Sequence, residues 1–357
     1  MAESLFTVFN VVRIFVLAAL GFFVAIVLTP IWNKILHKYK LGKQLRSIES
    51  APIFHELHKK KEGTPTMGGV IIWITVTLLA LVFWYLHSTA DGFWSRVNFF
   101  SRGQTWLPLG ALIVAAIFGL ADDLMGVFRK GPRGGGLRMR DRLLLYIVVA
   151  AGGAWWFYFK LDFNSINVPF LGDFAVGWWY IPFFIFVIVA SAFSANETDG
   201  LDGLAAGVFL TMFAAYGAIA FDQGRMDLVT FIAAIIGALI AFLWFNIFPA
   251  KFFMGDTGSM SLGVVLGIIA MLTNTPFLLI PIGVIFIIES GSVILQLVSK
   301  KLRHKKIFLS TPIHHHFEAR GWHETQVTMR FWMISAIGAI IGLIIFLVDS
   351  KLPPLLG

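Results

Sequence analysis

Ten long runs of apolar residues divide this chain, and no other feature restricts its fold as strongly. Most runs approach the ~20 residues that a helix needs to cross a bilayer. They are continuous rather than alternating, which favours helices over a membrane barrel. Hydrophobic residues make up 58% of the chain and charged residues 13%, and the mean hydropathy is +0.81. Since a soluble core could not bury so much apolar surface, we predict an all-α polytopic membrane protein.

We expect ten transmembrane helices within one integral membrane domain that comprises residues 1–357. The first apolar run has no basic start and no small-residue cleavage site before it, so we expect it to serve as an uncleaved insertion signal. Absence of cysteine excludes disulfides and thiolate metal sites. The expected spans are 8–31, 67–88, 106–121, 143–160, 178–195, 203–221, 229–247, 259–275, 278–298 and 331–349.

Lysine and arginine are distributed unequally between the two sides of these spans. Of 28 such residues, 22 fall in alternate loops and 5 on the opposite side, while Arg13 lies within the first span. The rich loops are 32–66, 122–142, 196–202, 248–258 and 299–330. Because basic loops stay in the cytoplasm, we expect these loops to be cytoplasmic and both termini to lie outside.

Five carboxylates lie beside the ends of apolar runs, all on the predicted cytoplasmic side. They are Asp122, Asp123, Asp199, Asp202 and Asp256. Carboxylates at a bilayer edge are costly to desolvate. Binding of a divalent cation and a phosphate substrate would explain such a cluster.

Each acidic motif also has an ordinary structural interpretation. Asp122-Asp123 suits a solvated helix end as well as a metal ion or a catalytic base. The segment 196–203 contains two Asp-Gly pairs that are common in turns, and Asp202 is suited to cap the next helix. Asp256 resembles a helix N-cap. Asn246, at the end of the preceding run, suits either a buried hydrogen-bonding role or a substrate contact.

Histidine, lysine and glutamate add further candidates. His314-His315-His316 cannot all face one ion if they are helical, so phosphate or nucleotide contact is favoured over zinc. Lys61 is a candidate phosphate ligand, although most lysines near it fit the positive-inside pattern. Glu289 lies inside the ninth run, away from the predicted cytoplasmic cluster, and we expect a structural role there, with Arg13 as a candidate partner.

Several motifs, taken in order, resemble a known family. They are Thr64-Pro65-Thr66-Met67-Gly68-Gly69, Asp122-Asp123, Asn196 through Asp202, Phe242-Leu243-Trp244-Phe245-Asn246, Phe253-Met254-Gly255-Asp256 and Pro312-Ile313-His314-His315-His316. Together they resemble the phospho-N-acetylmuramoyl-pentapeptide-transferase family, which belongs to the polyprenyl-phosphate N-acetylhexosamine-1-phosphate transferases. The histidines and the Thr-Pro-Thr-Met-Gly-Gly segment favour this branch over the N-acetylglucosamine branch.

The resemblance implies an enzyme of peptidoglycan biosynthesis in the bacterial inner membrane, with Mg²⁺, a homodimer and an active site facing the cytoplasm. It implies transfer of phospho-N-acetylmuramoyl-pentapeptide from UDP-MurNAc-pentapeptide to undecaprenyl phosphate, giving lipid I and UMP, with no nucleic-acid partner. Asp122, Asp123 and Asp256 are the implied catalytic residues, with Asp256 and Asp123 as metal ligands. The implied substrate-binding residues are Lys61, Asn196, Asp199, Asp202, Asn246, Phe253, His314, His315 and His316.

Other functions remain open from the residues alone. The nearest alternative is transfer of N-acetylglucosamine-1-phosphate to a polyprenyl phosphate. A polytopic transporter is the main alternative of another class, but transporter sites lie near the bilayer midplane and these carboxylates lie at one edge. Because a phosphate nucleophile is already mostly ionised near neutral pH, Asp122 is either a base or an organiser of the metal.

Overall fold

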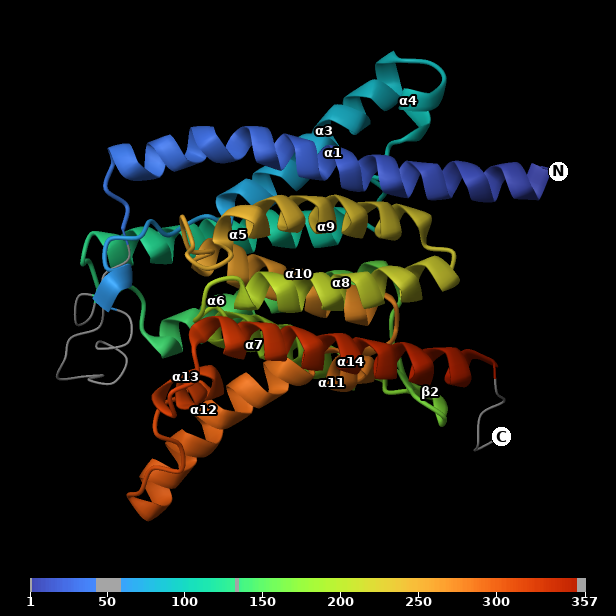
Figure 1. Ribbon diagram of the computed structural model, residues 1–357. Helices are drawn as coiled ribbons and strands as arrows, with labels where there is room; N and C mark the ends of the chain where they lie inside the picture. The colour runs from blue at the N-terminus through green and yellow to red at the C-terminus, as the bar shows by residue number, and fades with distance from the viewer. Residues whose placement is uncertain (1, 43–58, 132–134, 352–357) are drawn as a thin grey trace.

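The computed structural model describes residues 2–42, 59–131 and 135–351, and long helices running roughly parallel to one another dominate this part of the chain (Figure 1). The long helices are α1 (Ala2–Lys38), α3 (Val70–Thr89), α5 (Trp106–Val127), α6 (Met139–Lys160), α7 (Tyr180–Thr198), α8 (Leu204–Asp222), α9 (Met226–Asn246), α10 (Asp256–Leu272), α12 (Val284–Arg303) and α14 (Glu324–Lys351). The shorter helices are η1 (Lys59–Lys61), α4 (Phe93–Arg96), η3 (Gly177–Trp179), η4 (Pro276–Leu278), α11 (Leu279–Ile282) and α13 (Ile313–Ala319).

The helical membrane architecture expected from the sequence is confirmed in its main features. Among the residues described, 8 helices are long and apolar enough to cross a membrane, or 9 if one bent pair is counted as a single span. The remaining expected span corresponds to α10, a shorter apolar helix of 17 residues. Each expected span therefore coincides with helical structure, while the number of crossings stays a prediction.

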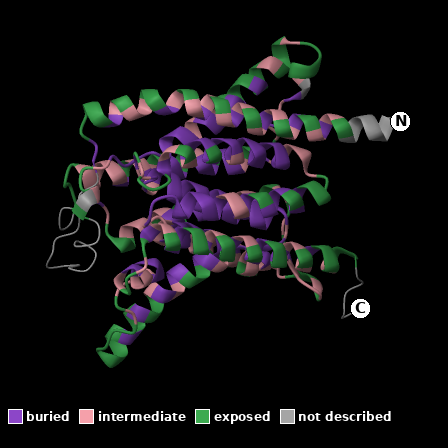
Figure 2. Cartoon of the chain, in the orientation of Figure 1, coloured by how far each residue is buried: buried purple, intermediate pink, exposed green. Residues whose placement is uncertain are grey.

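Helices α8, α9 and α10 form the buried centre of the bundle (Figure 2). Every residue of α10 from Thr257 to Leu272 is buried, as expected for a helix that is apolar on all sides. Helix α10 packs against α5 and α7, and α1 packs along α9. The outer helices expose large apolar side chains such as Phe15 and Met333, which suits contact with lipid.

Glycines allow the close approach of α1 and α9. A Cβ on Gly237 would overlap the carbonyl oxygen of Ala18, and a Cβ on Gly21 would overlap that of Ala234. Small residues at such crossings allow helix backbones to approach closely within membranes.

The ninth expected span, 278–298, is not one straight helix. The segment Pro276–Ile282 and helix α12 are bent by 85° relative to each other. Pro281 cannot donate a backbone hydrogen bond, and Gly283 stands between the two pieces, so the helix breaks there. Helix α12 consequently projects away from the other helices (Figure 1).

The all-α prediction omitted one short hairpin. Strands β1 (Ser165–Val168) and β2 (Gly172–Ala175) pair antiparallel in the connection between α6 and α7. Asn167 and Val168 of β1 lie opposite Asp173 and Gly172. With only four residues in each strand, the apolar–polar alternation is too short to be recognised from sequence.

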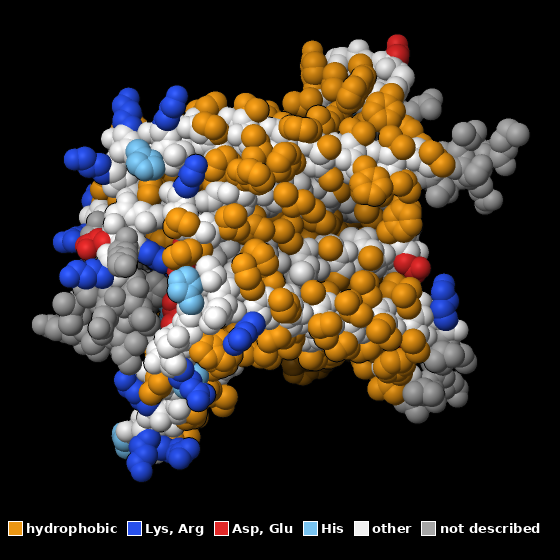
Figure 3. All heavy atoms as spheres, in the orientation of Figure 1, with side chains coloured by type: hydrophobic (Ala, Val, Ile, Leu, Met, Phe, Trp, Pro, Cys, Tyr) orange, Lys and Arg blue, Asp and Glu red, His pale blue; other side chains and the backbone are white. Residues whose placement is uncertain are grey.

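Basic side chains gather at one end of the bundle. In Figure 3, lysines and arginines cluster at the left end of the molecule, and a band of hydrophobic side chains covers the middle. The start of α1 and the end of α14 both lie at the opposite end (Figure 1).

Candidate active site

Helices α5 and α10 bring two predicted carboxylates together. The side chain of Asp123, on α5, accepts the backbone N–H of Asp256 at Oδ1 and that of Thr257 at Oδ2, both at 3.0 Å. Asp123 thus caps α10, where Asp256 had been expected to act as the cap. A Cβ on Gly119 would overlap the carbonyl oxygen of Asp256, so the glycine permits this crossing. The predicted proximity of Asp123 and Asp256 is therefore observed.

Arg142 connects the other members of the acidic cluster. Its Nε lies 2.6 Å from Asp122 Oδ2, and its Nη2 lies 3.0 Å from Asp256 Oδ2. Its Nη1 donates to Asn196 Oδ1 at 3.3 Å. Arg142 was not predicted as a site residue, because in the sequence it is only one of several basic residues in loop 122–142. A planar guanidinium is well suited to bridge two carboxylates.

Further hydrogen bonds fix the positions of Asn196 and Asp122. Asn196 Nδ2 donates to Asp256 Oδ1 at 2.5 Å, so its amide contacts both Asp256 and Arg142. Asp122 Oδ1 accepts the backbone N–H of Leu137 at 2.6 Å. Helix α5 continues to Val127, so Asp122 lies inside the helix. Asp122 is only 4% exposed and is therefore not part of a solvated helix end.

The turn between α7 and α8 connects several parts of the site. Asp199 Oδ2 accepts the backbone N–H of Gly255 at 3.1 Å. Asp202 Oδ2 accepts that of Ala250 at 2.9 Å. Gly203 has φ +75°, a left-handed conformation that favours glycine, and begins α8. Both aspartates thus hold the loop that precedes α10. They belong to a turn, as the structural interpretation proposed, and they also lie beside the acidic cluster.

Lys61 pairs with two carboxylates beside this turn. Its Nζ lies 2.7 Å from Asp202 Oδ1 and also forms an ion pair with Glu324. Glu324 Oε1 in addition accepts the backbone N–H of Asp202 at 2.7 Å. The ammonium lies 5.8 Å from the ring centre of Phe253 and 6.0 Å from that of Phe248. Lys61, Asp202 and Phe253 therefore lie together, and their contact with substrate stays a prediction. Glu324 carried no recognisable signal in the sequence.

Asn246 is a buried residue whose amide binds the backbone. Its Oδ1 accepts the N–H of Gly203 at 3.1 Å, and its Nδ2 donates to the carbonyl of Phe252 at 2.8 Å. The expectation of a buried hydrogen-bonding residue is confirmed. A contact between Asn246 and substrate stays a prediction.

His314 lies in the short helix α13 and contacts the same turn. Its Nδ1 is 2.9 Å from Glu289 Oε2, and both side chains are completely buried. A Cβ on Gly200 would overlap His314 Nε2, so this nitrogen faces the turn. Burial lowers the pKa of His314, but the charge and hydrogen bond of Glu289, together with the charges of Glu318 and Glu197, raise it above its ordinary value of 6.5.

The expectations for Glu289 and Arg13 are corrected by these contacts. Glu289 is not remote from the cluster, because the bend before α12 brings it to His314. Arg13 is not its partner, since Arg13 Nη2 lies 2.6 Å from Asp227 Oδ1. The sequence could not show the bend, which determines what Glu289 faces.

The remaining two histidines face different groups. His315 Nδ1 lies 2.7 Å from Glu318 Oε2, whereas His316 Nδ1 accepts the backbone N–H of Leu309 at 3.2 Å. The three rings do not converge on one ion, as their helical spacing predicted. Within the described ranges, no group of three or more His, Cys, Asp and Glu side chains has the arrangement of a metal site.

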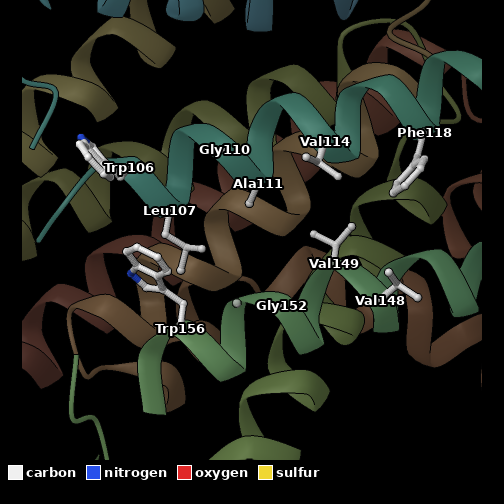
Figure 4. A pocket seen from close by; sticks show the side chains of 11 residues that line it. Trp106, Leu107, Gly110, Ala111, Val114, Phe118, Val148, Val149, Gly152 and Trp156 are labelled. Carbon is white, nitrogen blue, oxygen red and sulfur yellow. The ribbon is translucent and has the colours of Figure 1, made fainter. Parts of the chain in front are cut away.

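An apolar groove lies beside the acidic cluster, between α5 and α6 (Figure 4). Its volume is about 440 Å³, and Trp106 and Trp156 line the end away from the carboxylates. Phe118 lines the other end and lies one helical turn before Asp122 on the same face of α5. The groove therefore places apolar surface next to the ion pair of Asp122 and Arg142.

Known proteins resemble this chain over most of its length. Residues 105–274 match the description Glycosyl transferase family 4. Residues 61–72 match signature 1 of phospho-N-acetylmuramoyl-pentapeptide-transferase. A protein of that name from Listeria welshimeri serovar 6b is 36% identical over 91% of this chain and 95% of its own length. Another, from Clostridium novyi, is 38% identical over 90% of this chain and 93% of its own. The chain belongs to the phospho-N-acetylmuramoyl-pentapeptide-transferase family.

The family signature coincides with contacts that shape the site. It includes Lys61 and the segment Thr64–Gly69. Within it, Gly68 N–H donates to the carbonyl of Phe253 at 2.8 Å, and Gly69 N–H donates to that of Met254 at 2.9 Å. A Cβ on Gly69 would overlap Gly258. The signature therefore holds the backbone that leads into Asp256.

Proposed function

We propose that this chain transfers phospho-N-acetylmuramoyl-pentapeptide from UDP-MurNAc-pentapeptide to undecaprenyl phosphate and releases UMP. One observation carries the proposal: Asp122, Asp123 and Asp256 converge with Arg142 at the basic end of an apolar helix bundle. Two phosphorylated substrates repel each other, so a site for both needs cations held in place. The family relatives bear the name of this transferase.

The reaction exchanges one phosphoanhydride for another. An oxygen of undecaprenyl phosphate forms a bond to the sugar-linked phosphorus. The bond from that phosphorus to the bridging oxygen breaks, and UMP leaves with the electron pair. The nucleophile is already mostly ionised near neutral pH, so Asp122 need not remove a proton from it. We propose that Asp122 organises the cationic groups, a role that suits its pairing with Arg142.

Magnesium is the cofactor that we propose. The carboxylate of Asp123 accepts the backbone N–H of Asp256 and so lies beside that residue, and Mg²⁺ typically takes one or two carboxylates together with waters and substrate phosphates. Bound there, Mg²⁺ would neutralise charge on the diphosphate and stabilise the leaving group. Asp256 is the first ligand that we propose. Asp123, whose two oxygens each keep a lone pair beyond their backbone hydrogen bonds, is the second.

The substrate-binding residues fall into groups around the α7–α8 turn. We propose that Lys61 and Phe253 bind the uridine phosphate end, through charge and ring contact. Asn196, Asp199 and Asp202 would hold the surrounding loops and orient the substrate. His314, His315 and His316 are proposed as substrate contacts on the α13 side of this turn, and Asn246, which binds the backbone of Gly203 and Phe252, is proposed as a further contact. The groove between α5 and α6 offers apolar surface for a lipid-linked substrate.

We further propose that ten helices cross the bacterial inner membrane, with both termini outside and the site facing the cytoplasm. The basic end of the bundle, and the start of α1 and the end of α14 at the other end, support this orientation. The soluble nucleotide substrate and the lipid headgroup then meet at the inner leaflet. A homodimer is proposed from family resemblance.

The decisive experiment offers purified protein two uridine diphosphate sugars, each with undecaprenyl phosphate and Mg²⁺. UMP release with UDP-MurNAc-pentapeptide and not with UDP-N-acetylglucosamine is expected. The reverse preference would assign the chain to N-acetylglucosamine-1-phosphate transfer. Absence of UMP release with either sugar, from protein that is folded and inserted, would favour a transporter.

A variant connects the activity to the acidic cluster. Asp256→Ala should abolish Mg²⁺-dependent UMP release while the protein still folds, because Asp123 caps α10 through backbone N–H groups that the substitution retains. The matched control is Asp91→Ala, an exposed aspartate far from the cluster in sequence. Normal turnover of Asp256→Ala would refute the metal assignment.

A further inference from the structure

Helix α12 and the segment that follows it form a projecting arm. The helix is bent by 85° from α11 and extends away from the bundle (Figure 1). Gln296 fixes the returning chain, because its Oε1 accepts the N–H groups of Ile307 and Phe308 at 2.8 and 3.1 Å. Its Nε2 also donates to the carbonyl of Phe308 at 3.0 Å. We call residues 294–309 the α12 arm.

The tip of the α12 arm is strongly basic. Five of the seven residues 300–306 are lysine or arginine, and all are exposed. No Asp or Glu occurs from Ser290 to Phe317 to compensate this charge. Figure 3 shows these blue side chains at the lower left, at the extremity of the molecule. The tip therefore carries a concentrated positive charge without an internal partner in the sequence around it.

The same arm exposes apolar side chains beside this charge. Leu302, which lies among the cations, is 72% exposed. Ile294, Leu295 and Leu297 are also exposed, but they belong to the expected ninth span, where contact with lipid tails accounts for them. An amphipathic segment with basic and apolar side chains lies at a lipid interface, with its cations at the headgroups. The positive-inside rule explains orientation during insertion, but it does not require an exposed leucine between the cations.

We infer that the α12 arm is a binding surface for anionic phospholipid headgroups of the leaflet on the active-site side. Clusters of four to eight Lys or Arg next to a membrane helix bind acidic lipids, each cation contributing near the surface. The inference rests on the proposed membrane orientation and not on the proposed reaction. The arm is also connected to the candidate site, because Glu289 lies on α12 and its partner His314 lies in α13, which follows the returning segment.

The absence of cysteine allows a direct test. A fluorophore is attached to Leu302→Cys in the arm, and in a separate protein to Tyr39→Cys near the basic end of α1, where Tyr39 is 62% exposed. Each protein is placed in vesicles that contain a quencher-labelled phosphatidylglycerol or a quencher-labelled phosphatidylcholine at equal mole fraction. Quenching reports which headgroup lies near the label and does not depend on turnover.

We expect phosphatidylglycerol to be preferred at the arm by at least about fivefold and at Tyr39 by less than about twofold, because the arm carries five cations in a short segment. The arm preference should fall to the Tyr39 level in a variant with Lys300→Gln, Lys301→Gln and Lys305→Gln. A matched variant with Lys34→Gln, Lys38→Gln and Lys40→Gln should leave it unchanged.

Two outcomes would overturn the inference. One is equal quenching by the two lipids at position 302. The other is a preference for phosphatidylglycerol that stays undiminished after Lys300, Lys301 and Lys305 are replaced. High salt should also weaken the preference, since screening acts on exposed charges. Because all substituted side chains are exposed, loss of folding is checked simply by elution as a single species in detergent.

Discussion

Arg142 is the residue whose role most affects the chemistry of the site. Its guanidinium neutralises Asp122 and Asp256, at 2.6 and 3.0 Å. A divalent cation bound to these carboxylates would experience repulsion from Arg142. The same charge is suited to bind phosphate oxygens of the substrate. Arg142 would thus oppose binding of the metal ion alone and attract an anionic substrate.

Substitution of Arg142 separates these two effects. Arg142→Gln should bind Mg²⁺ about tenfold more tightly in the absence of substrate, because the repulsion is removed. Its kcat/KM for UDP-MurNAc-pentapeptide should nevertheless fall by about 100-fold or more, since a charged hydrogen-bond donor is lost. Isothermal calorimetry and UMP release measure the two quantities. Weaker Mg²⁺ binding would mean that Arg142 organises the carboxylates for the metal instead of opposing it.

His314 and Glu289 form a buried pair whose contribution depends on pH. Burial lowers the pKa of His314, but the charge and hydrogen bond of Glu289 and the charges of Glu318 and Glu197 together raise it in the folded protein; the ring of His315 also lies beside it. Below the ordinary value of 6.5, the imidazole is charged in both folded and unfolded chains, so the pair stabilises the folded state fully. As pH rises through the raised pKa, the proton leaves and this contribution is lost.

Glu289→Gln should therefore cost most at low pH. We expect about 1–3 kcal/mol of stability to be lost below pH ~6.5, with a smaller loss at high pH. Thermal unfolding in detergent across this pH range measures the difference from the unsubstituted protein. The exposed Glu62→Gln serves as control and should have no effect. An equal cost of Glu289→Gln at all pH values would show that the pair is not ionic.

At the scale of the elements, the crossing of α5 and α10 determines the position of the carboxylates. Gly119 lies where the two helices touch, and a Cβ there would overlap the carbonyl oxygen of Asp256. Gly110 is on the same helix, but nothing lies within 4 Å of where its Cβ would be. These two glycines form a matched pair for testing the crossing.

Gly119→Ala should destabilise the protein by about 1–3 kcal/mol, because the added methyl group forces α5 away from α10. It should also lower turnover, since Asp123 would move relative to Asp256. Gly110→Ala should be neutral or stabilise by up to about 1 kcal/mol through helix propensity. Thermal unfolding is measured for both variants, and UMP release is measured for Gly119→Ala against the unsubstituted protein, because Gly110 lines the groove between α5 and α6. Equal stability of the two variants would contradict the role of the crossing.

Single helices were predicted well where one pattern determines them. The apolar runs predicted the positions of α3, α7 and α9 to within a few residues, since each helix satisfies its backbone internally. The bend at Gly283 was missed because Pro and Gly also occur in unbroken membrane helices. The hairpin Ser165–Ala175 was missed because its strands are short.

At the scale of the whole molecule, the proposed orientation of the chain in the membrane can be tested. Single cysteines introduced at Lys40 and Lys130 should react with a membrane-impermeant maleimide only from the cytoplasmic side. Cysteines at Asp91 and Asp162 should react only from outside. All four positions are exposed, so accessibility to the reagent depends on the side of the membrane. Labelling of both pairs from one side would refute the proposed crossing pattern.

The sequence by itself determined the class of this protein and indicated that its acidic residues gather at the basic end of the helix bundle. Hydropathy and the positions of Lys and Arg are one-dimensional signals, and each segment enters the bilayer largely by its own composition. The motifs from Thr64 to His316 also sufficed to indicate the family.

Only the tertiary structure decided which charges meet. Arg13 pairs with Asp227 across 214 positions of sequence, and Lys61 pairs with Glu324 across 263. Such pairs depend on how the helices cross, and the crossings depend on close backbone contacts such as those at Gly119 and Gly237. A pattern of residues along the chain does not contain the angle or register of these crossings, so Arg142 and Glu324 became visible as members of the site only in three dimensions.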